Sequence, residues 1–491
     1  MKKSVLNFVK DNKVFGIALF VGFCGLWFSG LSHPYIYDDQ WTIVKNESIH
    51  SVLPIHRFFL DSETVAATDV NMHKTIYRPL PTLSFAIQNA LSGLNPLSFR
   101  IWNVVGHFLG GILLLVFLRR WGNLKAFPCL LAVGIFWFHP VQVETVHWIT
   151  QRSNIFCFLF SLLSLILLLD RKKGNHYLWG GLVSYGAALL SKEWAIVLPF
   201  LFLVAEWDWK KNRKLFFGLV AVSLAYLLMR YQILGQLGQR EFRSNQFLTN
   251  WLVGRASWWE YLKLLIFPAH LTVSHHQYVD EPVRSAGSWI GLMLEIGFLL
   301  GCVWSFRKKR WALLEGMLWI YFPLILVLGF FPTDTFVAER FLYFSVAGFG
   351  WLIAQGMNGR HQKWKLGLSF ILLLLFWGRS FSRIQDFKTE VTLWESATQK
   401  EPENAFATSC LAVAYQNKGE DEKAIVAFKE SLKKKPSREL AFGVLNNLSL
   451  LYLERNEPDK ALEWINKALS IHPQHPKALL NKKRALAEKE S

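Results

Sequence analysis

Two adjacent carboxylates, Asp38 and Asp39, follow directly on an apolar run over residues 13–32. A carboxylate at such a position can take a proton from a hydroxyl group as a general base. A helix cap or a solvated turn would also use aspartate. The value of the pair as a candidate site therefore depends on which other polar side chains the chain places near the ends of its apolar runs.

Further charged and polar residues stand near the ends of other apolar runs. They are Arg78, Glu144, Arg152, Lys192, Arg340 and Tyr343. Arginine and lysine side chains are strong donors to phosphate oxygens, although each could also contact a phospholipid headgroup or form a local salt bridge. Carboxylates and cations that gather at one membrane surface would form a site that amphipathic substrates can reach.

This set of residues fits the transfer of a sugar from a polyprenyl phosphate to a hydroxyl acceptor. The acceptor needs a base, which a carboxylate supplies. The leaving phosphate needs no proton, but it needs cations and hydrogen-bond donors. The lipid needs an apolar groove between helices. Attack from the face opposite the phosphate would invert the anomeric carbon.

The composition predicts the scaffold that must position these residues. Hydrophobic residues make up 52% of the 491 residues, with 22 Trp, 40 Phe and a mean hydropathy of +0.22, which is typical of a polytopic membrane protein. Runs long enough to cross a bilayer predict an all-α protein with about eleven spans. They lie at 13–32, 99–118, 124–138, 154–170, 176–191, 193–207, 215–234, 287–306, 311–330, 341–357 and 365–379.

Basic residues in the short loops predict the orientation. The basic clusters fall before the first span and then in alternate loops, so one assignment puts all of them in the cytoplasm. They are Lys2-Lys3, Arg119-Arg120, Arg171-Lys172-Lys173, Lys210–Lys214, Arg307–Arg310 and Arg360–Lys365. This assignment puts the long loops 33–98 and 235–286 outside, and the C-terminal tail with them. The aromatic residues after Trp258 predict a helix at the membrane interface.

The tail from about Phe381 contains a helical repeat. Leu411, Ala412, Tyr415 and Gly419 recur as Leu448, Ser449, Tyr452 and Asn456, and the match continues to Pro436 and Pro473. These positions fit the tetratricopeptide pattern, with part of an earlier repeat around Trp394 and a capping helix at 476–489. We therefore divide the chain into a membrane domain, 1–380, and a repeat domain, 381–491. Such a repeat array binds peptide segments, or it serves as a spacer or an oligomer contact.

Other chemistries find weaker support. The net charge of +18 would suit nucleic-acid binding, but much of the positive charge lies between apolar runs, so we expect no nucleic-acid partner. His139, His147, His275 and His276 form no zinc motif. Neither a Gly-x-Ser-x-Gly elbow nor a phosphate-binding glycine loop occurs. We expect no required cofactor, although Asp38 and Asp39 could bind a divalent cation.

Short motifs spread along the chain resemble those of one enzyme family. They are Tyr37-Asp38-Asp39-Gln40-Trp41, Tyr77-Arg78-Pro79-Leu80, Gly93-Leu94-Asn95-Pro96, His139-Pro140-Val141-Gln142-Val143-Glu144 with Trp148 and Arg152, Ser191-Lys192-Glu193, and Arg340-Phe341-Leu342-Tyr343. With the repeats, they resemble the polytopic, lipid-phosphosugar-dependent glycosyltransferases of the GT-C fold. The similarity is greatest to the transmembrane and tetratricopeptide-repeat O-mannosyltransferases and their bacterial relatives.

The resemblance implies a role for each candidate residue. Asp38 would be the base, and Asp39 would orient the substrate or share that role. Arg78, Lys192 and Arg340 would hold the lipid phosphate, while Glu144 and Arg152 would line the sugar or phosphate pocket. The donor would be a polyprenyl-phosphate-linked mannose or similar hexose. The acceptor would be a Ser or Thr of an exported protein, bound through the repeats.

Two other functions remain open on the sequence alone. A non-catalytic membrane scaffold would use the repeats but not the outer carboxylates and cations. A lipid or solute transporter would place ionisable residues near the bilayer midplane, where only Arg230 and Glu295 are candidates, with Glu315 near a span end. The short repeat array favours a bacterial inner membrane, with the endoplasmic reticulum as the alternative. His275 and His276, where the family pattern predicts an acidic-aromatic pair, leave the sugar and the acceptor open.

Overall fold

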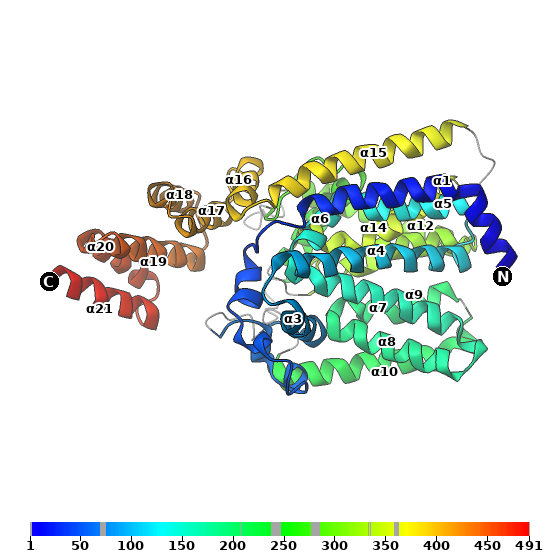
Figure 1. The fold of residues 1–491 in the computed structure, drawn as a ribbon, viewed down its shortest axis with the longest axis horizontal. Coiled ribbons are helices and arrows are strands. Elements are labelled where there is room, and N and C mark those ends of the chain that lie inside the picture. The colour runs from blue at the N-terminus through cyan, green and yellow to red at the C-terminus, as the bar shows by residue number, and fades with distance from the viewer. Residues whose placement is uncertain are drawn as a thin grey trace. The chain divides into compact units, whose positions relative to one another are not determined.

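All regular elements in the described part of the chain are helical, as the composition predicts (Figure 1). The structure, a computed structural model, describes residues 2–68, 75–206, 208–236, 247–275, 285–331, 333, 335–357 and 363–490. His276 and residues 360–362 of the basic cluster Arg360–Lys365 lie outside these residues. The chain forms two compact units, Met1–Leu271 with Gln277–Phe387, and Thr272–His276 with Lys388–Ser491.

The larger unit contains the apolar helices. Its α-helices are α1 (Lys2–Trp27), α2 (Arg57–Leu60), α3 (Pro79–Ser92), α4 (Pro96–Arg120), α5 (Ala126–Phe138), α6 (Gln142–His147), α7 (Arg152–Leu169), α8 (Asn175–Ser191), α9 (Leu198–Ala205), α10 (Trp209–Leu234), α11 (Phe247–Ile266), α12 (Ala286–Arg307), α13 (Trp311–Leu324), α14 (Tyr343–Met357) and α15 (Lys363–Asp386). Short helical turns join them: η1 (Phe28–Gly30), η2 (Gln40–Val44), η3 (Glu47–His50), η4 (Ser62–Val65), η6 (Ile149–Gln151), η7 (Arg171–Lys173), η8 (Glu193–Val197) and η10 (Glu339–Leu342).

A helix occupies each of the eleven predicted spans, and six of these helices are long and apolar enough to cross a membrane among the described residues. Those six stretches are Lys13–Gly30, Pro96–Arg120, Ile149–Leu169, Trp209–Leu234, Ala286–Arg307 and Trp364–Asp386. Ala126–Phe138, Glu193–Ala205 and Trp311–Leu324 are apolar but shorter. The chain is therefore a membrane protein, and the number eleven stays a prediction.

The spanning helices bury only part of their apolar surface within the protein. In α15, Phe370, Ile371 and Leu375 are exposed, whereas Leu373 and Phe376 are buried. Since a water-soluble protein rarely exposes a continuous apolar surface, the exposed side of this helix is suited to contact lipid. The buried side packs on α1 and α5, and it fixes α15 against the helix that leads to the acidic pair.

The helix predicted at the membrane interface forms as α11, but its central tryptophan faces the protein interior. Trp258 is fully buried against the rings of Phe298 and Tyr321. A glycine allows α11 to approach its neighbours closely, because a Cβ on Gly254 would lie 1.9 Å from the carbonyl oxygen of Leu328. The helix therefore packs into the larger unit along one side.

The smaller unit is a stack of paired helices, as the repeat predicts. Its helices are α16 (Glu390–Lys400), α17 (Ala405–Asn417), α18 (Asp421–Lys433), α19 (Arg438–Glu454), α20 (Pro458–Ile471) and α21 (Pro476–Glu490). The small residues of the motif, Ala412, Ala424 and Ala461, are fully buried. At one close contact the Ser449 hydroxyl donates to the carbonyl of Ala461 at 3.0 Å. Small side chains at these positions let the helices approach closely.

Candidate active site at one end of the membrane helices

The loop after α1 turns sharply just before the acidic pair. Tyr37 has a φ of +47°, a left-handed conformation that costs free energy for a residue with a bulky side chain. The turn is closed by a hydrogen bond from the Asp39 amide to the carbonyl of Ile36 at 3.0 Å. Strained backbone of this kind is found most often at functional sites, so the turn supports Asp38 and Asp39 as candidates.

Both carboxylate oxygens of Asp39 accept backbone amides that fix this turn. Its side chain is fully buried, and one carboxylate oxygen accepts the amide of Thr150 at 3.0 Å while the other accepts the amide of Ile36 at 3.3 Å. Burial raises the pKa of Asp39 to about 7, and the charge of Arg100 and the two amides oppose that rise. Asp39 therefore joins the loop to the segment before α7.

Arg100, in the second turn of α4, fixes the chain that leads to the acidic pair. Its guanidinium donates to the carbonyls of Leu31 and Pro34 at 3.0 Å, to that of His33, and to that of His147 at 3.2 Å. At the same place a Cβ on Gly30 would lie 2.4 Å from the His147 ring. The end of α1 is thus locked against α4 and α6.

Asp38 differs from Asp39 in having a free carboxylate. Its side chain is half-buried, and within the described ranges no residue donates a hydrogen bond to it or forms an ion pair with it. Burial raises its pKa to about 6, while the charges of Arg340 and Arg78 act in the opposite direction. A carboxylate that no protein donor occupies, and that titrates near neutral pH, is suited to act as a general base.

Glu144 holds one of the cations that face Asp38. One oxygen of Glu144 pairs with the Arg340 guanidinium, and the other accepts the Arg340 backbone amide at 2.9 Å. Glu144 is completely buried, whereas the Arg340 side chain is 19% exposed. The resemblance implies that Glu144 lines the sugar or phosphate pocket, and this role stays a prediction; both of its oxygens bind Arg340. It positions this cation in the structure.

Lys192 and Arg78 complete the cationic group. The Lys192 ammonium donates to the Asn154 side-chain oxygen at 2.6 Å and lies 4.6 Å from the centre of the Trp194 ring. Burial, together with the charges of Arg78 and Arg340, lowers its pKa to about 7. In the part of the chain that the structure describes, no partner binds the Arg78 guanidinium, and its Nε is buried without a hydrogen bond.

The structure thus gathers three of the predicted cations, Arg78, Lys192 and Arg340, near the free carboxylate of Asp38. Asp38 interacts electrostatically with Arg340 and Arg78, and Lys192 with both of these cations. Nearby, Glu193 pairs with Arg230 of α10 at 3.6 Å. This is a cationic group beside a base, and it can bind an anion next to the group that takes a proton.

Two other predicted site residues lie inside the helix packing. Tyr343 is buried, and its hydroxyl is 2.9 Å from Nδ1 of His107. Arg152 is fully buried and donates to three side chains and one carbonyl from α3 and α4. Its acceptors are Asn103 at 3.0 Å, Ser84 at 3.0 Å, Gln88 at 2.7 Å and the carbonyl of Phe99 at 2.9 Å. Their roles in substrate binding stay predictions.

We expect Arg152→Met to destabilise the protein, because it leaves four buried acceptors without their donor. The expected loss is about 3 kcal/mol or more in the free energy of unfolding, measured as a lower melting temperature in detergent. Arg152→Lys should also destabilise, since an ammonium cannot reproduce the planar fork. Arg120→Met is the control, because its ion pair with Asp170 is 38% exposed on the arginine side and should contribute at most about 1 kcal/mol. A stable but inactive Arg152→Met protein would instead support a direct role at the substrate.

Two arginines that no sequence motif singles out, Arg100 and Arg383, organise this end of the unit. Arg100 falls inside the predicted span 99–118. Arg383, assigned above to the tail, lies in α15, where it binds Glu339 at 3.0 Å and Asp386 at 2.7 Å. Because Glu339 precedes Arg340, this buried pair fixes the backbone that carries the cation. A charged residue inside an apolar helix was the available signal in both cases.

Two of the three ionisable residues that suggested transport, Glu295 and Arg230, have partners. Glu295 of α12 binds Arg255 of α11 at 2.8 Å and accepts the hydroxyl of Tyr321. Arg230 lies near the end of α10 and donates to the carbonyl of Thr75 at 3.0 Å. Both arrangements are consistent with helix packing.

Several of the side chains considered above as metal ligands have other contacts in the structure. Among the residues that the structure describes, no three His, Cys, Asp or Glu side chains are grouped so that they could hold a metal ion. His139 binds the carbonyl of Leu265 at 2.9 Å, and His147 stacks on Trp27. Backbone amides contact both oxygens of Asp39, and cation binding by Asp38 and Asp39 stays a prediction.

Comparisons with known proteins agree with both parts of the chain. A tetratricopeptide repeat model matches residues 442–475. The chain is 28% identical over 469 residues to the protein O-mannosyl-transferase TMTC4 of Mus musculus, covering 80% of this chain and 63% of that protein. It is 24% identical over 519 residues to the protein O-mannosyl-transferase TMTC3 of Homo sapiens, covering 93% of this chain and 55% of that protein.

A third relative extends the similarity to a more distant animal. The protein O-mannosyl-transferase F38B6.6 of Caenorhabditis elegans is 23% identical over 401 residues, which cover 77% of this chain and 56% of that protein. The chain thus spans between 55% and 63% of the length of these three relatives. No solved structure matches the chain.

Proposed function

We propose that this chain is a protein O-glycosyltransferase that moves a hexose from a polyprenyl-phosphate carrier to a Ser or Thr hydroxyl. The observation that carries the proposal is the free carboxylate of Asp38, which interacts with Arg340 and Arg78, while Lys192 interacts with the same two cations. The relatives, which are named protein O-mannosyl-transferases, support mannose as the first sugar to test.

In this mechanism Asp38 takes the proton of the acceptor hydroxyl as the hydroxyl oxygen attacks the anomeric carbon. The bond from that carbon to the phosphate oxygen breaks, and its electron pair leaves with the polyprenyl phosphate. Arg78, Lys192 and Arg340 stabilise the charge that develops on the phosphate. Attack from the face opposite the phosphate inverts the anomeric carbon, and Asp38 later releases its proton to water.

The remaining residues of the site position these groups. Glu144 holds Arg340 by two bonds, and Asn154 holds Lys192. Asp39 and Arg100 hold the turn that presents Asp38. The division of roles between the two aspartates follows from their bonding, because only Asp38 has a carboxylate that a substrate can occupy.

We propose that the reaction takes place on the extracytoplasmic face, since the alternating basic loops predict that Asp38 and the repeats lie on the side away from the cytoplasm. A bacterial inner membrane and the endoplasmic reticulum membrane both offer polyprenyl-phosphate sugars on that face. The repeats would bind an extended segment of the acceptor protein. This use of the repeats matches the usual function of such arrays.

Mass spectrometry of exported proteins from cells with and without this chain tests the proposal. We expect exported proteins to carry added hexose masses on Ser or Thr only when the chain is present. Deletion of residues 388–491 should abolish modification of large acceptors but leave transfer to a short Ser/Thr peptide. Transfer that is lost for both acceptors would favour a scaffold function for the repeats. Identical exported proteins in the two cell lines would contradict the proposal.

The pKa values of the site predict a bell-shaped pH profile for kcat/KM. The acidic limb should lie near pH 6, because Asp38 must be ionised to take a proton and burial raises its pKa to about 6. The basic limb should begin near pH 7, where Lys192 in the enzyme without substrate loses the charge that binds phosphate. Lys192→Arg, which stays charged, should move the basic limb upward. A flat profile between pH 5 and 8 would contradict both assignments.

A further inference from the structure

A polar cavity lies at the end of the larger unit opposite Asp38. Its volume is about 750 Å³. Helix α4 runs from the Asp38 loop to the cavity. Arg100 near its start contacts the loop before Asp38, and Trp121 beyond its end lines the cavity. Twenty-five helical residues cover about 37 Å. The cavity is therefore separate from the candidate active site, and the basic loops around it predict that it faces the cytoplasm.

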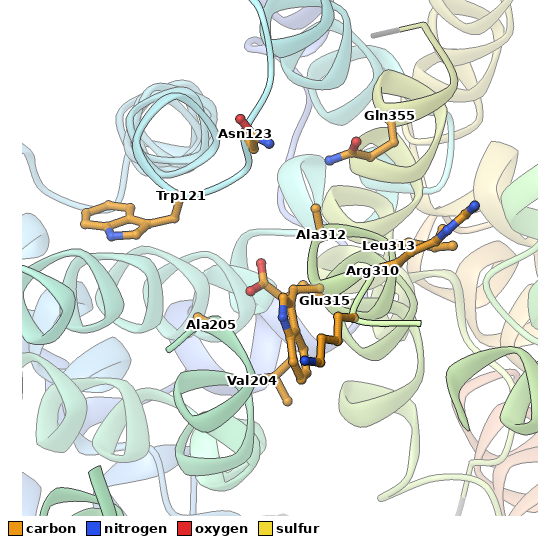
Figure 2. A pocket seen from close by; sticks show the side chains of 11 residues that line it. Trp121, Asn123, Val204, Ala205, Arg310, Ala312, Leu313, Glu315 and Gln355 are labelled. Atoms are coloured by element: carbon orange, nitrogen blue, oxygen red, sulfur yellow. The ribbon is translucent and has the colours of Figure 1, made fainter. Parts of the chain in front are cut away.

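The floor of this cavity carries a buried carboxylate. Glu315, in the second turn of α13, is 5% exposed, and its Oε2 has no hydrogen-bond partner among the described residues. Figure 2 shows the carboxylate pointing from α13 into the space between Trp121 and Ala205. A buried carboxylate without a donor is unfavourable. It is suited to a ligand that brings a positive charge and N–H groups.

The other lining residues define what such a ligand must look like. The indoles of Trp121 and Trp311 line the cavity, and indole rings attract cations. Lys309 also lines it and is exposed, and no ion pair within the described ranges reaches its ammonium. The guanidinium of Arg310 stacks on Trp304 at 4.6 Å. The cavity thus offers a place for a cation at Glu315 and one for an anion at Lys309.

We propose that this cavity binds an aminoalkyl phosphate, the headgroup of a phosphatidylethanolamine-type lipid. Its ammonium would donate to Glu315 and its phosphate would contact Lys309. A volume of about 750 Å³ is in the range of pockets that hold small ligands. The exposed apolar surfaces of the membrane helices give the acyl chains a place to lie. A glycerol headgroup has no cation for Glu315, and a choline headgroup has no N–H group, so both should bind more weakly.

Native mass spectrometry of the purified full-length chain in detergent tests this proposal with defined lipids. Short-chain phosphatidylethanolamine should bind at least about tenfold more tightly than the matching phosphatidylglycerol and phosphatidylcholine. Glu315→Gln should weaken phosphatidylethanolamine binding about tenfold and leave phosphatidylglycerol binding unchanged. Lys309→Met should weaken the binding of both lipids. Glu260→Gln is the control, because this half-exposed carboxylate pairs with Lys263 on α11.

With the lipid probes, three outcomes would overturn the proposal. The first is wild-type binding of phosphatidylethanolamine by Glu315→Gln. The second is equal binding of the three lipids. The third is no change with Lys309→Met, an exposed position where substitution should not disturb folding. The binding of free phosphoethanolamine distinguishes a membrane lipid from a soluble compound as the natural ligand. Binding as tight as that of the lipid would assign the site to a soluble compound and reject a membrane lipid.

Discussion

Asp38→Asn should lower the rate of sugar transfer by two to four orders of magnitude, the contribution typical of a general base. The protein should fold as well as the wild type, because no described residue donates to the Asp38 carboxylate. Burial raises the pKa of that carboxyl to about 6, so its charged form is less favourable in the folded state than in the unfolded one. Removing the charge at pH 7 should therefore not lower the melting temperature.

Two variants separate this effect from a general loss of charge in the loop. Asp61→Asn removes an exposed carboxylate from the same loop, where Asp61 accepts the amide of Glu63 at 2.9 Å, and should leave transfer unchanged. Asp39→Asn should lower both the melting temperature and transfer, because an amide cannot accept both of the hydrogen bonds that Asp39 accepts. Asp38→Asn activity within threefold of wild type would remove Asp38 from the chemistry.

Arg340→Met should lower kcat/KM for the lipid-linked donor about 10²- to 10³-fold, the range seen when one donor to a developing anion is removed. Arg340 is the cation held most firmly beside Asp38, since Glu144 binds both its backbone and its side chain. The variant also leaves Glu144 buried without a cation, so some loss of stability is expected. Transfer must therefore be compared at equal amounts of folded protein.

Charge-matched variants distinguish phosphate binding from structure at this position. The double variant Arg340→Met/Glu144→Gln also removes the charge of Glu144, which Arg340→Met leaves without a cation. It should therefore recover the stability that Arg340→Met loses, but not the transfer. Lys45→Met removes an exposed cation from the Asp38 loop and should have no effect on transfer. Recovery of transfer in the Arg340→Met/Glu144→Gln protein would show that Arg340 acts only through folding, and would leave Arg78 and Lys192 to bind the phosphate.

The helices and the repeats could be predicted because their signals are local. Each apolar run that the sequence offered is a helix, and the small residues of the repeat, such as Ala412 and Ala461, are buried where the motif requires them. The limits of α15 were less clear. The change in composition at Phe381 falls inside that helix, which continues to Asp386, because its polar last turn packs against Glu339.

The division of roles among the charged residues could not be predicted, because it depends on contacts between distant segments. Glu144 and Arg340 are 196 positions apart, and nothing in either motif indicates that one holds the other. Arg152 stands in a motif that resembles a substrate site, yet its donors bind side chains of α3 and α4. Similarly, the aromatic pattern of α11 did not indicate that Trp258 faces inward.

Transfer by the purified chain in proteoliposomes tests the central claim most directly, namely that Asp38 activates an acceptor beside a cationic phosphate site. The assay would combine synthetic polyprenyl-phosphate mannose, a Ser/Thr peptide, and either the wild-type or the Asp38→Asn protein. We expect the wild type to produce a mannosyl peptide with the anomeric configuration inverted relative to the donor, and the variant to produce almost none. Equal products from both proteins, or a retained configuration, would contradict the account.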